Sequence, residues 1–162
     1  MKNTSETIVI LGMHRSGTST IARILASIGI NMGERIMGAN ESNPFGHYEN
    51  LDFVELNDEI LINAGGSWKK PPPKITILES ETEYKDKIVS CIERNKASIW
   101  GWKDPRSCLT IDLFHKHLDN PKYIICYRNS QKIAESLFKR ERIDFETGIN
   151  LANYYKNEIT EF

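Results

Sequence analysis

The chain predicts a three-layer α/β/α domain built on a parallel sheet, and three observations support this. The apolar, β-branched run at 7–11 has the character of a buried strand, and it leads directly into a glycine-flanked turn. Two more short apolar segments, at 98–102 and 122–127, have the same character, and helical patterns separate the three. Strands that alternate with helices are typical of a parallel sheet covered by helices.

The first helix is expected directly after the turn. Ile21, Ile24, Leu25 and Ile28 recur at helical spacing on one face, and Gly29 is placed to end the helix. This apolar stripe is expected to pack on the sheet.

The remaining elements follow from the same periodicities. A long connection rich in Gly and Asn is expected to face a substrate, and three consecutive prolines predict an irregular, semi-rigid segment. Apolar residues at helical spacing predict four more helices. The connection spans 31–50, the proline segment 68–74, and the helices lie at 51–64, at 84–95, around 111–118 and around 149–159.

Length and composition predict one soluble globular domain over residues 1–162. The chain is 40% hydrophobic and 27% charged. A net charge of −1 argues against nucleic acid or a membrane surface as the partner, because it supplies no bulk attraction to polyanions. No apolar run is long enough for a transmembrane segment, so a cytoplasmic location is expected. Cys91, Cys108 and Cys126 lack metal-ligand spacing and are expected to be reduced, and no metal site is predicted.

The turn after the first strand has the composition of an anion-binding loop. Gly12 and Gly17 have the spacing of the nucleotide-binding P-loop, which indicates a P-loop NTPase-like fold. Thr18 stands where the P-loop lysine would follow the second glycine, and the positive charge lies inside the loop, at Arg15. This departure argues against ordinary ATP or GTP hydrolysis. The loop is still suited to a phosphate or sulfate group, because its backbone N–H groups and the start of the helix favour an anion.

Every predicted strand ends at a basic residue. Arg15 follows the first strand, Lys103 and Arg106 follow the second, and Arg128 follows the third. Ligands of parallel α/β sheets bind beyond the carboxyl ends of the strands. The four cations are therefore expected to surround one polyanionic ligand.

Two segments resemble sulfotransferases that use 3′-phosphoadenosine 5′-phosphosulfate (PAPS). The segment His14-Arg15-Ser16-Gly17-Thr18-Ser19 is similar to their 5′-phosphosulfate loop, and Tyr127-Arg128-Asn129 through Ser136-Leu137 is similar to their 3′-phosphate element. Gly46-His47-Tyr48-Glu49 and Trp102-Lys103-Asp104-Pro105-Arg106 resemble motifs of bacterial members. The likeness covers roughly residues 8–140.

The resemblance implies a sulfuryl-transfer reaction with PAPS as co-substrate and without a metal. Arg15 would stabilise the departing phosphate, and Lys103 would add positive charge near the transferred group. The implied donor-binding residues are His14, Arg15, Ser16, Gly17, Thr18, Ser19, Arg128 and Ser136.

Three residues are candidates for the base that takes the acceptor's proton. Cytosolic members of the family carry a histidine two positions after the strand-end lysine, but Pro105 occupies that position here. Glu49 matches the place of a catalytic glutamate in some bacterial members. His47 and Asp104 are the alternatives.

The resemblance implies a small-molecule or glycan acceptor, which the sequence does not identify further. Family members generally continue beyond the helix at 149–159, so the usual C-terminal elements are expected to be missing, and a second copy or a partner chain could complete the fold. Two other functions stay open. One is a P-loop kinase for a small molecule, with Asp104 as its magnesium-binding acid, and the other is an inactive nucleotide-binding remnant.

Overall fold

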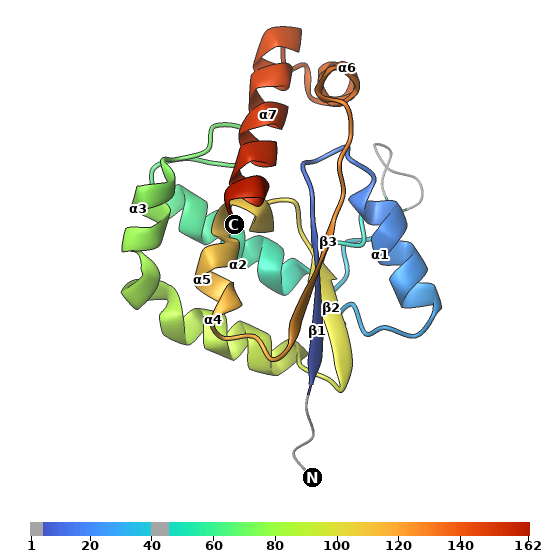
Figure 1. Cartoon of the computed structure of the whole chain (residues 1–162), viewed down its shortest axis with the longest axis vertical. Coiled ribbons are helices and arrows are strands. Elements are labelled where there is room, and N and C mark those ends of the chain that lie inside the picture. The colour runs from blue at the N-terminus through green and yellow to red at the C-terminus, as the bar shows by residue number, and fades with distance from the viewer. Residues whose placement is uncertain (1–4, 40–45) are drawn as a thin grey trace.

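Three parallel strands form the centre of the computed structural model, which describes residues 5–39 and 46–162 (Figure 1). The first strand lies between the other two, in the order β2-β1-β3, and both pairings are parallel. The predicted α/β architecture with a parallel sheet is confirmed, and the sheet is open. The strands are β1 (Glu6–Leu11), β2 (Ile99–Lys103) and β3 (Pro121–Ile125).

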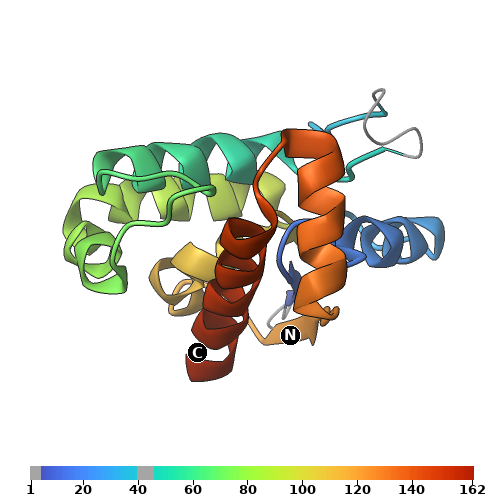
Figure 2. The ribbon, with the colours of Figure 1, turned by 90° about the horizontal axis from the view of Figure 1, so that it is seen from above.

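Helices lie on both faces of this sheet, and one face carries more helices than the other. Figure 1 shows α1 on one side of the strands and α2 to α5 on the other, and Figure 2 shows the same arrangement from above. The last two helices pack on each other near the carboxyl ends of the strands. The helices are α1 (Thr18–Ser27), α2 (Leu51–Asn63), α3 (Lys74–Glu79), α4 (Glu81–Asn95), α5 (Ser107–His115), α6 (Ser130–Glu141) and α7 (Phe145–Glu161).

The alternation of side chains along β1 divides the core in two. Val9 and Leu11 belong to a large core with α2, α4, α5 and α7, whereas Ile10 faces a small core under α1. The large core contains stacked aromatic rings, with Phe53 lying 4.1 Å from Trp102 between ring centroids. Burial of these rings supplies much of the apolar area that holds the helices of this face to the sheet.

The predicted apolar stripe of α1 is wrong at two of its four positions. Ile24 is 49% exposed and Ile28 is 69% exposed, while Ile21 and Leu25 are half-buried. The fully buried residue of α1 is Ala22. Its small side chain allows α1 to approach the narrow sheet closely along that line, so the stripe is rotated partly toward solvent.

The third strand is shorter and less buried than the segment 122–127 predicts. It spans Pro121–Ile125, and Ile125 is 40% exposed. Both β2 and β3 are edge strands, but the tryptophan side chains of β2 are buried in the large core, whereas the side chains of β3 are less completely covered.

The predicted helices at 51–64 and 84–95 correspond to α2 and α4, and Ile88 and Ile92 of α4 are buried as expected. Part of the long connection expected to face a substrate, residues 40–45, lies outside the described residues. Within the described ranges, no helix combines the length and the apolar character needed to cross a membrane.

Candidate functional site

The loop between β1 and α1 is a tight turn that only particular residues can form. A side chain on Gly12 would place its Cβ 2.8 Å from the carbonyl oxygen of Cys126, so the close approach of β3 requires glycine there. Gly17 has φ 96° and Arg15 has φ 69°, both in the left-handed region. Because α1 starts at Thr18, the positive end of its helix dipole faces the turn.

The loop contacts two residues that follow it in the chain by more than 100 positions. The Nη1 of Arg128 donates to the carbonyl oxygen of Arg15 at 2.7 Å. The Nε of Arg15 donates to the hydroxyl of Ser136 at 2.8 Å. The strand-end arginine and the α6 serine therefore lie against the glycine loop.

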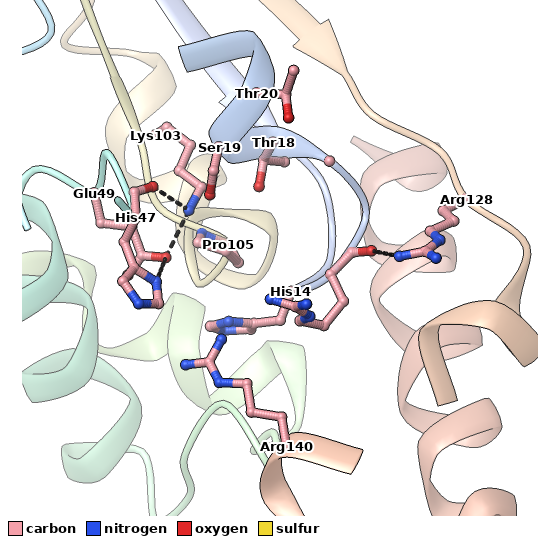
Figure 3. A pocket seen from close by; sticks show the side chains of 12 residues that line it. His14, Thr18, Ser19, Thr20, His47, Glu49, Lys103, Pro105, Arg128 and Arg140 are labelled. Atoms are coloured by element: carbon pink, nitrogen blue, oxygen red, sulfur yellow. Dashed lines mark hydrogen bonds and ion pairs between the residues drawn. The ribbon is translucent and has the colours of Figure 1, made fainter. Parts of the chain in front are cut away.

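These elements enclose a cavity of about 210 Å³, which we call the main cavity (Figure 3). Its walls come from the glycine loop and α1, the segment before α2, the ends of β2 and β3, and the end of α6. The lining residues are His14, Arg15, Gly17, Thr18, Ser19, Thr20, His47, Glu49, Lys103, Pro105, Arg128 and Arg140.

Positive charge dominates the main cavity. Burial lowers the pKa of Arg15, and the nearby guanidinium groups of Arg140 and Arg128 lower it further. Mutual repulsion of this kind is relieved when an anion binds among the cations. Both the charge of the cavity and its glycine loop therefore favour an anion there.

The buried pair of Lys103 and Glu49 forms one wall (Figure 3). Lys103 is 2% exposed, and its Nζ donates to Glu49 Oε1 at 2.6 Å and to the carbonyl oxygen of His47 at 3.1 Å. The other carboxylate oxygen of Glu49 lies 3.7 Å from Arg106 Nη1. Burial lowers the pKa of Lys103, and Glu49 opposes that shift. The carboxylate of Glu49 is thus held between two cations.

Asp104 does not line the main cavity. It is fully buried, and its Oδ2 accepts from Asn57 at 2.8 Å. Its Oδ1 accepts from Arg106 Nη1 at 2.8 Å and from the backbone N–H of Arg106 at 3.2 Å. Burial raises the pKa of Asp104. Both carboxylate oxygens are engaged in holding the turn after β2.

Two histidines of the main cavity carry a ring nitrogen without a partner. The Nε2 atoms of His14 and His47 are buried, and neither makes a hydrogen bond. Burial lowers the pKa of both rings, which keeps them neutral at neutral pH. His47 Nδ1 lies 4.0 Å from Glu49 Oε1. The ring of His14 packs against Trp68, with the centroids 4.2 Å apart and the ring planes tilted by 34°. A neutral imidazole with an unpartnered nitrogen can accept a proton or hydrogen-bond a ligand.

The structure adds Arg140 and Trp68 to the residues considered from the sequence. Arg140 lies four positions after Ser136 in α6, so both are on one helix face, and this spacing could have indicated it. Trp68 follows no motif. Its contact with His14 depends on how the segment before α3 folds back over the glycine loop.

Most predicted site residues meet at the main cavity, and four do not line it. Two of these, Asp104 and Arg106, bind each other at the turn after β2. The hydroxyl of Ser16 is buried without a partner in a neighbouring crevice, and Ser136 touches Arg15 rather than the cavity. The predicted residues that line the cavity are His14, Arg15, Gly17, Thr18, Ser19, His47, Glu49, Lys103 and Arg128.

Comparisons of the chain with protein-family models, with curated proteins and with solved structures found no match.

Proposed function

We propose that this protein transfers a sulfuryl group from PAPS to a hydroxyl or amine of a small-molecule or glycan acceptor. One observation carries the proposal. The loop that resembles a 5′-phosphosulfate site and the arginine that resembles a 3′-phosphate site line the same cavity, and Arg128 hydrogen-bonds the backbone of Arg15. A nucleotide with an anionic group at each end fits such a pair of adjacent sites.

The donor end of the reaction requires stabilisation of a leaving phosphate. In sulfuryl transfer, the new bond from the acceptor oxygen to sulfur forms as the bond from sulfur to the bridging phosphate oxygen breaks, and the electron pair leaves with the phosphate. Arg15, Lys103 and the start of α1 supply positive charge on the side where this charge accumulates. The products are a sulfated acceptor and 3′-phosphoadenosine 5′-phosphate (PAP).

The acceptor's proton has to pass to a base, and we assign this role to His47. Its Nε2 is buried, unpartnered and neutral, whereas Glu49 is hydrogen-bonded to Lys103. In this assignment Glu49 neutralises Lys103 and faces the Nδ1 side of the imidazole, which leaves Nε2 as the proton acceptor.

The proposal includes a P-loop NTPase-like fold for this chain. The order β2-β1-β3, with the glycine loop after the central strand, is compatible with a P-loop NTPase-like arrangement. A kinase of the same fold is disfavoured, because Asp104, its candidate magnesium ligand, has both oxygens hydrogen-bonded away from the cavity.

The test first compares how strongly two nucleotides stabilise the protein, and it then measures sulfuryl transfer. PAP is expected to raise the Tm of the protein more than ATP does at equal concentration, because only PAP carries a 3′-phosphate. The purified protein is also expected to release PAP from PAPS in the presence of an acceptor panel. Arg15→Ala should abolish this release while PAP still binds, and Arg94→Ala on α4, outside the main cavity, is the matched control.

Equal stabilisation by PAP and ATP would contradict the assignment of the donor. Preferential PAP binding without turnover of PAPS on any acceptor would instead favour the inactive nucleotide-binding remnant. Whether a second copy or a partner chain takes part is measured in the same samples by light scattering.

A further inference from the structure

Ser136 does not present its hydroxyl to a cavity. Its oxygen accepts a hydrogen bond from Arg15 Nε, and the residue lines neither the main cavity nor the next one. This contact fixes the guanidinium of Arg15 against α6. Ser136 is therefore placed to position Arg15. Because it lines neither cavity, we look for the group that would recognise a second phosphate among the other residues beside Arg128.

A second cavity adjoins Arg128 and offers such a group. We call it the side cavity; it measures about 380 Å³ and is lined by Tyr127, Arg128, Asn129, Ser130 and Lys156. The hydroxyl of Ser130 donates to Asn153 Oδ1 at 2.7 Å, which ties the start of α6 to α7. Lys156 comes three residues after Asn153, on the same face of α7.

The two cations of the side cavity lack carboxylate partners. Within residues 5–39 and 46–162, neither Arg128 nor Lys156 forms an ion pair, whereas Lys132 on α6 pairs with Glu135. The N-terminal end of α6 also faces this cavity, at Ser130. Two unpaired cations and a helix N-terminus favour a dianion.

A buried polar atom connects the side cavity with the glycine loop. Ser16 is 9% exposed, its Oγ has no hydrogen-bond partner, and it lines a crevice together with Tyr127, Arg128 and Lys156. An unsatisfied buried hydroxyl is costly, and this atom lacks a partner in the structure. The crevice has a volume of only about 20 Å³, and it adjoins the side cavity through the residues that the two share.

We propose that Lys156, together with Arg128, recognises the ribose phosphate of the donor in the side cavity, and that Ser136 positions Arg15. This inference rests on the proposed function, since it names the residue that selects a nucleotide with a second phosphate. A phosphomonoester carries close to two negative charges at neutral pH, which matches the two cations. Lys156 is exposed, so its replacement by the similarly long Met side chain is expected to leave the fold intact.

The experiment compares PAP with 5′-AMP, which lacks the ribose phosphate, by calorimetry on the full chain. Lys156→Met is expected to weaken PAP binding about tenfold, the loss of one charge-assisted hydrogen bond, and to leave 5′-AMP binding unchanged. Lys132→Met, which removes a lysine already paired on α6, is the control and should change neither affinity. Ser136→Ala should lower PAPS turnover while the ratio of the PAP and 5′-AMP affinities stays at its original value.

Each alternative outcome is decisive. If Lys156→Met leaves PAP affinity unchanged, or weakens both nucleotides equally, the inference is wrong while the proposed donor stands. If Ser136→Ala removes the preference for PAP, the serine binds the phosphate and its positioning role is wrong. If the original protein prefers neither nucleotide, the proposed donor fails and the inference fails with it.

Discussion

At the scale of single residues, the candidate site depends on which polar atoms are already occupied. Glu49 lines the main cavity, but its Oε1 accepts from a lysine that is itself buried. The two buried charges compensate each other, and removing either partner would leave the other uncompensated. His47 lies beside this pair with one ring nitrogen unpartnered. In the proposed reaction, this free nitrogen, rather than the nearest carboxylate, takes the acceptor's proton.

The pH dependence of turnover tests this assignment. Burial lowers the pKa of His47 below its usual value of 6.5, so the ring is mostly neutral at neutral pH and becomes protonated in acidic solution. The rate of PAP release from PAPS is therefore expected to be constant above neutral pH and to fall in acid, with a midpoint below pH 6.5. His47→Asn should lower the rate at pH 7.5 by about 10²-fold or more.

The control for this series is His117→Asn, because His117 also has a buried, unpartnered Nε2 but lies outside the main cavity. The His117→Asn variant should keep the original rate of PAP release, and its rate should fall at acidic pH as that of the original protein does. A His47→Asn variant with the original rate and profile would return the role of base to Glu49.

At the scale of elements, the pairing of α6 with α7 positions Arg140 and Lys156, which line the two cavities, and Ser136, which holds Arg15. α6 carries Ser136 and Arg140 on one face, and α7 carries Lys156. The two helices approach closely at Gly148, where an added Cβ would lie 3.0 Å from both Cα and Cβ of Ala134. Glycine at this point of α7 permits the approach, at the expense of helix propensity.

Gly148→Ala tests how tightly this pairing is constrained. In an exposed helix the change would stabilise by about 1 kcal/mol, but here the new methyl group overpacks the contact with Ala134. We expect the free energy of unfolding to fall by about 1 kcal/mol in urea titrations. Asn157→Ala, at an exposed position of α7, should raise it by a few tenths of a kcal/mol, since only propensity changes there. Stabilisation by Gly148→Ala would show that the helices separate readily.

At the scale of the whole molecule, a three-stranded sheet holds a cationic cavity closed by segments far apart in the chain. The surroundings of His14 therefore come from several distant segments. Its ring packs against Trp68 and lies near Lys103, Arg106 and Arg140. Burial lowers its pKa well below the usual value of 6.5, and these cations lower it further. The folded protein keeps this imidazole neutral in a pH range where the unfolded chain protonates it.

The stability of the protein should therefore decrease below pH 6.5. There the unfolded state binds a proton that the folded state does not, so the free energy of unfolding falls by up to about 1.4 kcal/mol per pH unit from this residue. Urea unfolding at pH 6.5 and 5.5 measures the slope. His14→Phe keeps a ring against Trp68 and should show a shallower slope, whereas an unchanged slope in that variant would assign the pH dependence to other groups.

The sequence by itself determined the local elements and the identity of the loop. Hydrophobic periodicity and the Gly12 to Gly17 spacing depend on neighbours in the chain, so the parallel strands, α2, α4 and the residues of the glycine loop could be predicted. The rotation of α1 and the exposure of β3 could not, because they depend on the width of the sheet and on how completely other elements cover its third strand.

Only the tertiary structure decided which predicted site residues are free to act. The motifs indicate Glu49, Asp104 and Ser136, but Glu49 and Asp104 already accept hydrogen bonds from Lys103 and Arg106. Ser136 accepts from Arg15 and lines neither cavity. These partners come from other elements of the fold, up to 121 residues away in the chain. The availability of a polar atom depends on all the groups packed around it, and that is a property of the folded chain rather than of a motif.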